Sequence, residues 1–274
     1  MTINCVRFTL LFLFFTALPH FLLAQTDTTD VDNSDKSYVS AGLNYDSKVV
    51  FQGRTDGIQQ FGVSPSIYYQ HRKGFNASYS ANFWSAEASQ PSLHNLGVGW
   101  DFELSDSWNM SLNYARWILG NGDAADASAL NNYASFDLSF APGTWSFTAL
   151  PSINFGNSAA LSLNFSATKF FIFSKIFSDK DRFLILPTFS TTIASDNRFS
   201  ASKAALKKLK KGLSGQSFKP TVYEISIPVK YKLNDNLSFG ATFHYVVPLN
   251  LTAAESNLTG ISYFSFSSSY KFYR

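Results

Sequence analysis

The sequence predicts an all-β protein, a transmembrane antiparallel up-and-down β-barrel of about 12 strands. Three observations lead to this fold class: apolar and small polar residues alternate through the chain, short and long connections alternate, and the composition is unusual for a domain that faces water. Of the 274 residues, 17% are aromatic and 15% are charged, whereas an average globular domain has about 25% charged residues. This composition suits a surface that contacts lipid.

A period of two residues recurs from Tyr38 to the end of the chain and defines twelve segments. Successive side chains of a strand point to opposite faces, so each segment has one apolar row and one small polar row. Runs of about ten residues with this alternation, separated by turn residues, are typical of membrane barrels. The apolar rows span residues 39–45, 61–69, 75–83, 96–104, 108–116, 134–140, 145–155, 161–167, 183–193, 223–231, 237–247 and 264–272.

The segment 234–250, NDNLSFGATFHYVVPLN, raises the question of which row faces outward. A strand that faces water usually carries Lys, Glu and Arg on its outer row, but Ser238, Gly240 and Thr242 are small and neutral. We therefore expect the apolar rows to contact lipid and the polar rows to line the lumen. Rings available for the interfacial girdles are Trp100, Trp108, Tyr114, Trp145, Tyr231 and Tyr270.

The connections give a second test of the barrel. The even-numbered ones are short and rich in turn formers, at residues 71–74, 105–107, 141–144, 178–182 and 234–236. The odd-numbered ones are longer, at 52–60, 85–94, 119–132, 195–220 and 249–259, with 156–158 as the exception. Because membrane barrels have short turns at the periplasmic end, twelve strands place both termini on the periplasmic side.

The N-terminus divides the chain into three parts. Residues 1–24 combine Arg7, an apolar run and a small-residue cleavage point, so they form a predicted secretory signal peptide, with a membrane anchor as the weaker alternative. Residues 25–37 are polar and acidic and are predicted to be disordered. Residues 38–274 form the predicted barrel. The only cysteine, Cys5, falls in the signal peptide, so the mature chain has no disulfide.

The alternation and the last strand, YFSFSSSYKFYR, resemble bacterial outer-membrane β-barrel proteins over nearly the whole mature chain. This resemblance implies an outer-membrane location, contact with outer-membrane lipid and lipopolysaccharide, and insertion by the barrel-assembly machinery. The chain departs from the pattern by ending on Arg274 rather than on an aromatic residue. The stretch from Ser47 to Trp84 is similar to small porin-like families of Bacteroidota type that open with an SKY…RG strand and loop.

Few charges are expected inside the barrel. They are Asp46, Asp101, Glu103, Asp137, Glu224, Lys230, Lys232 and Lys271, and His244 also points into the lumen. Asp101 and Glu103 precede one short turn and Lys230 and Lys232 precede another, so opposite charges are expected at similar height. They form either a constriction that screens solutes by charge or salt bridges that stiffen the barrel.

An enzyme is the main alternative class, since a triad needs a nucleophile, a base and an acid within hydrogen-bond reach. The histidines of the mature chain are His71, His94 and His244, and no serine lies in a G-x-S-x-G motif. No metal-ligand spacing or phosphate loop is present, so we expect no metal and no cofactor. The net charge of +3 is too small to indicate a nucleic-acid partner.

The stretch 200–219 is rich in lysine, and its leucines have the spacing of a short amphipathic helix. In the longest outer loop it would contact anionic lipopolysaccharide, attract anionic solutes into the lumen, or remain a solvated loop. The candidate anion-binding residues are Lys203, Lys207, Lys208, Lys210 and Lys211.

The small polar lumen favours a passive, weakly selective channel for small polar solutes. A barrel with a filled lumen that serves a structural or surface-binding role is the second interpretation, and an outer-membrane lipid hydrolase is the third.

Overall fold

The computed structural model describes residues 36–50, 60–85, 91–119, 131–156, 159–195, 218–250 and 259–274. The predicted signal peptide 1–24, nearly all of the predicted disordered segment 25–37 and the lysine-rich stretch up to residue 217 lie outside these ranges. No helix in the described segments is long and apolar enough to cross a membrane.

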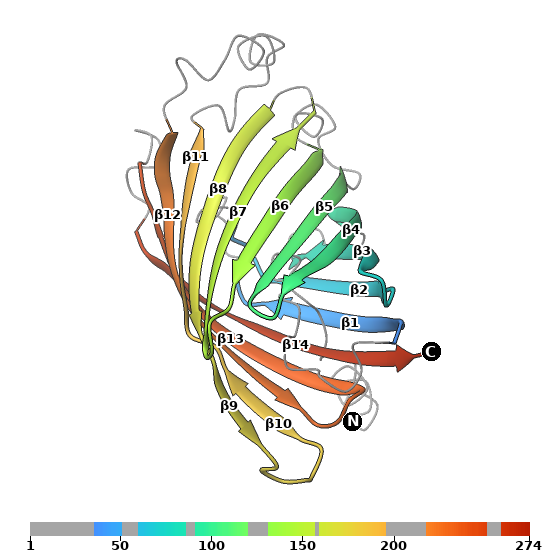
Figure 1. The fold of residues 1–274 in the computed structure, drawn as a ribbon. Helices are drawn as coiled ribbons and strands as arrows, with labels where there is room; N and C mark the ends of the chain where they lie inside the picture. The colour runs from blue at the N-terminus through green and yellow to red at the C-terminus, as the bar shows by residue number, and fades with distance from the viewer. Residues whose placement is uncertain are drawn as a thin grey trace, which may run out of the picture.

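All the described strands belong to one antiparallel sheet (Figure 1). They are β1 (Tyr38–Asp46), β2 (Gly62–Gln70), β3 (Phe75–Trp84), β4 (Leu93–Ser105), β5 (Trp108–Leu119), β6 (Asn132–Phe140), β7 (Trp145–Phe155), β8 (Ala159–Lys169), β9 (Phe171–Ser174), β10 (Arg182–Ile185), β11 (Thr188–Ser195), β12 (Phe218–Lys232), β13 (Leu237–Pro248) and β14 (Ile261–Tyr273).

Twelve of these strands close into a barrel. Neighbours in sequence pair from β1 to β8, β8 pairs with β11, β11 with β12, and the circle closes where β14 pairs with β1. The prediction of an all-β, twelve-stranded antiparallel barrel is therefore confirmed. The difference lies after the eighth predicted segment and within the ninth. The apolar run that follows 161–167 forms β9, and 183–193 is divided between β10 and β11, so that β9 and β10 form an additional hairpin outside the circle.

The interruption has a local cause. β7 begins at Trp145, opposite Lys169, so the chain beyond β8 has no partner strand on that side. Pro187 has no backbone N–H to give to a ladder, and its carbonyl accepts from the N–H of Lys169 at 3.0 Å. The fifteen-residue β12 extends past β11 and pairs with β10 as well.

Both described ends of the chain lie at the end of the barrel that carries the short turns, here called the short-turn end. Tyr38, the first residue of β1, is opposite both Gln70 and Tyr273. Gly74 in the adjacent turn has φ of 93°, which favours glycine, and a Cβ there would collide with the carbonyl oxygen of Asp101. The opposite end is the long-connection end. That the short-turn end is periplasmic stays a prediction.

The apolar rows face outward around the circle. On β12 and β13, Ile225 and Tyr245 are directly opposite each other and exposed, while Ser226 and His244 form the neighbouring buried pair. The same parity holds on β14, where Phe264 and Phe266 are exposed and Ser265 is buried between them. The small polar rows therefore form the inner face of the barrel, as the alternation predicted.

Candidate functional site

The predicted lumen residues divide into two groups. Six of them line a single cavity of about 1050 Å³ at the short-turn end: Asp101, Glu103, Asp137, Lys230, Lys232 and Lys271. Glu224 and His244 do not line that cavity and instead contact each other farther toward the long-connection end, with His244 Nδ1 at 2.7 Å from Glu224 Oε1. We call the cavity and its walls the open half of the lumen.

One wall of the open half is acidic. Asp101 on β4, Ser111 on β5 and Asp137 on β6 are directly opposite one another in the strand pairing. Ser111 donates to Asp101 at 2.7 Å, and Asn76 donates to the same carboxylate at 3.1 Å. Within the described residues, neither carboxylate has an ion-pair partner. The wall therefore presents negative charge that hydroxyl and amide groups position.

Gly99, two residues before Asp101, lies beside this wall at a position where a larger residue would collide with neighbouring side chains. A Cβ at Gly99 would lie 2.7 Å from Asn76 Oδ1 and closer still to Asn113 Oδ1. The missing side chain leaves room for both amides, one of which holds Asp101.

The other wall is basic. Lys230 on β12 is exposed to the cavity, Lys232 is largely buried, and Lys271 on β14 lies with its Nζ 4.7 Å from the centroid of the Tyr38 ring. In the closed order β12 to β14 lie across the barrel from β4 to β6. A solute in the open half would pass between opposite charges, which gives the site a transverse field.

The long-connection half is filled, and we call it the packed half. Many of its inward side chains are buried, among them Asn44, Ser66, Ser80, Asn95, Ser152, Asn154, His244 and Ser265. Two inward ring pairs contribute to this filling. His244 stacks on Tyr263 with centroids 4.3 Å apart. Trp117 stacks on Tyr133 at 6.0 Å, and Tyr133 also lines the cavity, so this pair marks the border between the two halves. Rings and buried amides thus occupy positions that the small polar rows would leave open.

A hydrogen-bonded chain crosses four strands in the packed half. Ser265 on β14 donates to Asp46 on β1 at 2.6 Å, His244 Nε2 on β13 lies 3.3 Å from Ser265 Oγ, and His244 Nδ1 contacts Glu224 on β12. Since Ser265 gives its proton to Asp46, the chain with ionised carboxylates is complete when both ring nitrogens of His244 carry a proton. The chain bridges the pairing of the first and last strands.

This arrangement includes a serine, a histidine and a glutamate, but it does not present a nucleophile. Ser265 is 2% exposed, it does not line the cavity, and its hydroxyl donates to Asp46 rather than to His244. A serine activated by a histidine needs its proton on the histidine side and access to a substrate. We therefore interpret His244 as a structural hydrogen-bonding residue.

Sequence reasoning missed Ser265 and the inward rings. Tyr68, Tyr133, Tyr263 and Trp117 each occupy a position of a small polar row, and that parity was the available signal. The described residues hold no group of three or more His, Cys, Asp or Glu that could bind a metal ion. The five lysines of the predicted anion-binding loop lie outside the described residues.

No protein-family model matches the sequence, and no curated protein matches it. Among solved structures, the chain is similar to the KdgM porin, with 8% identity and a TM-score of 0.47 over 86% of this chain and 99% of that one. It is similar to the NanC porin with 10% identity and a TM-score of 0.46, over 86% of this chain and 100% of that one. It is similar to LpxR from Salmonella typhimurium with 10% identity and a TM-score of 0.46, over 85% of this chain and 99% of that one. At these identities and TM-scores the similarities carry no argument about function.

Proposed function

We propose that the chain is an outer-membrane barrel whose lumen is a passive channel for small polar solutes, weakly selective for charge. The observation that carries this proposal is the open half, a cavity of about 1050 Å³ between an acidic and a basic wall. Export by the signal peptide 1–24, insertion by the barrel-assembly machinery and contact with lipopolysaccharide belong to the same proposal.

The exterior supports a position in a membrane. Phe147, Phe189 and Phe266 point outward and are each about half exposed, as are many other large apolar side chains around the circle. Water-soluble proteins rarely expose such a continuous apolar surface. At the short-turn end Trp108 stacks on Phe140 at 4.7 Å, and Lys169 Nζ lies 5.0 Å from the Trp145 ring, which is the arrangement of an interfacial girdle.

The two walls suggest how the channel would select. The carboxylates of Asp101 and Asp137 would attract cations to one side, while Lys230 would attract anions to the other. A neutral or dipolar solute would be held least strongly by either wall alone. The lumen therefore favours small polar solutes over strongly charged ones. Its preference between cations and anions is modest and should change when either wall is altered.

Conductance in planar bilayers tests this proposal. We expect ion-conducting steps from the wild-type barrel in a KCl gradient. The double variant Asp101→Asn, Asp137→Asn should shift the reversal potential towards anion selectivity, and Lys230→Gln should shift it towards cation selectivity. Shifts of the same sign in both variants, or no conductance in any of them, would contradict a channel with opposed walls.

A barrel with a closed lumen that serves a structural or surface-binding role is the second candidate. The burial of the inward side chains in the packed half favours it. If the barrel is folded and heat-modifiable on gels but gives no conductance, the result would favour this role over the channel.

We propose no catalytic role. The low exposure of Ser265 and its hydrogen bond to Asp46 argue against acyl transfer. Incubation with phospholipid or lipid A should therefore release no fatty acid, and release that is lost in Ser265→Ala would overturn this conclusion.

A further inference from the structure

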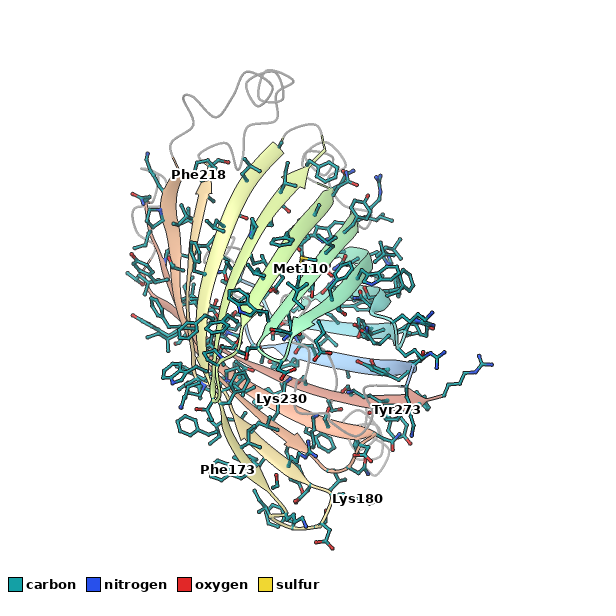
Figure 2. All side chains as sticks on the ribbon, in the orientation of Figure 1. Met110, Phe173, Lys180, Phe218, Lys230 and Tyr273 are labelled. Carbon is teal, nitrogen blue, oxygen red and sulfur yellow. The ribbon has the colours of Figure 1, made fainter. Side chains whose placement is uncertain are left out.

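The hairpin of β9 and β10 is the only described connection at the short-turn end that continues as paired strands outside the closed circle. In Figure 1 it extends below β12 and β13, and Phe173 and Lys180 mark it at the bottom of Figure 2. β10 pairs with β12 on one edge and with β9 on the other, so β9 forms a free edge of the sheet.

The tip of the hairpin is held in one arrangement by Asp181. This side chain is 1% exposed, and its carboxylate accepts from the N–H groups of Ile176 and Phe177 and from the hydroxyl of Tyr231, at 2.8, 2.8 and 3.0 Å. Burial disfavours the charged carboxylate, but these hydrogen bonds outweigh it and lower the pKa of Asp181. The tip is therefore preorganised.

This preorganised tip presents apolar side chains to the outside. Phe177 is 83% exposed, and Phe171, Phe173 and Ile176 are each nearly half exposed. Because Asp181 holds the backbone of Ile176 and Phe177 by hydrogen bonds, these two side chains are exposed on an ordered turn. Such a patch on an ordered tip indicates a site that contacts another apolar phase.

The patch is continuous with the outer face of the barrel. Phe173 is opposite Phe183, which is opposite Tyr231 of the outward row. Phe177 packs edge-on against the same Tyr231 ring, with centroids 6.0 Å apart. The phase that contacts the outer face would thus contact the hairpin as well, which favours lipid over a partner in the lumen.

Basic residues flank the apolar residues of this patch in the sequence. They are Lys169, Lys175, Lys180 and Arg182, against the exposed Asp179 and the buried Asp181. Amphipathic elements with rings on one side and cations around them bind the boundary of anionic phospholipid membranes.

We propose that the β9–β10 hairpin binds phospholipid of the leaflet at the short-turn end, with Phe171, Phe173 and Phe177 among the acyl chains and Lys175 and Lys180 at the phosphates. This inference rests on the proposal that the barrel spans a membrane. It adds a lipid-binding element beyond the spanning strands, which would fix the barrel's depth at that interface.

Nitroxide labelling tests the proposal directly, since the single cysteine of the sequence, Cys5, lies in the predicted signal peptide. Phe177→Cys is labelled in the full mature protein, reconstituted in vesicles of phosphatidylethanolamine and phosphatidylglycerol. Phe165→Cys on the outward row of β8 is the lipid control, and Asp106→Cys in a short turn at the same end is the water control. Accessibility to oxygen and to a water-soluble nickel chelate is measured by spin-resonance power saturation.

We expect the label at position 177 to favour oxygen over nickel, as at position 165, and the label at position 106 to favour nickel. A nickel preference at 177 with an oxygen preference at 165 would overturn the hairpin proposal and leave the membrane barrel intact. Low access to both reagents at 177 would mean that protein covers the tip and would also overturn it. A nickel preference at 165 would remove the membrane proposal itself.

The lysine contribution has its own test. In the Lys175→Gln, Lys180→Gln background, the label at 177 should move towards water in vesicles that contain phosphatidylglycerol and stay unchanged in phosphatidylcholine. Equal accessibility in both backgrounds and both lipids would overturn the role of the two lysines.

Discussion

In the open half of the lumen, the inner face carries Asp101, Asp137 and Lys230 around a cavity, whereas at the border of the packed half the same kind of row carries Trp117 and Tyr133 in a half-buried stack. Both halves are built from alternating strands with small polar inner rows. A few large or charged residues placed in those rows decide whether the space inside is filled. The polar row alone therefore does not predict an open lumen, and the sequence must be examined at each height.

Removing the rings of the packed half should have the largest effect. In the variant Trp117→Ser, Tyr133→Ser, we expect single-channel conductance to rise severalfold, because the stacked rings occupy the inner face at that height. The loss of two large, half-buried side chains should also lower the free energy of unfolding by about 3–5 kcal/mol. Asn109→Ala in the open half is the control and should leave conductance near the wild-type value, so equal conductance in both variants contradicts the comparison.

His244→Ala should have the second-largest effect, a loss of stability in the packed half. The substitution removes the imidazole between Glu224 and Ser265 and takes from the half-buried Glu224 carboxylate its hydrogen bond to His244. Ser265 keeps its bond to Asp46, and we expect the free energy of unfolding to fall by about 2–3 kcal/mol. Urea unfolding in detergent micelles, followed by tryptophan fluorescence, measures this change. Lys230→Ala, whose side chain faces the cavity, should change stability by about 0.5 kcal/mol or less. Equal urea midpoints would show that the hydrogen-bonded chain contributes no stability.

The predicted lysine-rich loop falls in the connection between β11 and β12, whose described ends, Ser195 and Phe218, lie at the long-connection end. Replacing Lys207, Lys208, Lys210 and Lys211 with Gln should leave the barrel folded. It should weaken lipopolysaccharide binding at low salt by about 1 kcal/mol per lysine near the surface, an effect that shrinks as salt rises. Binding unchanged at low ionic strength would mean that the loop is only solvated.

Gly99→Ala gives the smallest expected effect and concerns the open half. The added methyl group must displace Asn76 or Asn113, so we expect about 1 kcal/mol of lost stability. We also expect a small shift in ion selectivity, because Asp101 loses one of the two amides that donate to it, Asn76 and Gln70. The double variant Gly99→Ala, Asn113→Ala should recover part of both changes. A single variant indistinguishable from wild type would show that the wall tolerates the methyl group.

The period of two predicted most of the fold because it is a local property of each strand. Twelve strands, an apolar outer row such as Ile225 and Tyr245, and the short turns all follow from neighbouring residues. The hairpin of β9 and β10 was not predicted, because it forms only where β12 extends beyond the end of β11. The apolar run 170–173 also hides the alternation there. A strand's length relative to its partner is a property of the sheet.

The sequence predicted which residues line the lumen, but it predicted only in part which of them lie together. Parity placed Asp101, Asp137, Lys230 and His244 inside, but the register decides that Asp101 and Asp137 share one height while His244 meets Glu224 and Ser265. Register follows from the stagger of the whole barrel, which single segments do not reveal. The inward rings were missed for another reason, because aromatic residues were assigned to the outer surface as a class.

The hydrogen bond between Ser265 and Asp46 joins positions 219 residues apart. Closing a loop of that size is entropically costly, so this contact should form only after the other strands are in place. Interactions that form late leave the folding rate nearly unchanged and slow unfolding instead. The seam between β1 and β14 should thus act as a kinetic lock, whose loss shortens the lifetime of the assembled barrel without slowing its assembly.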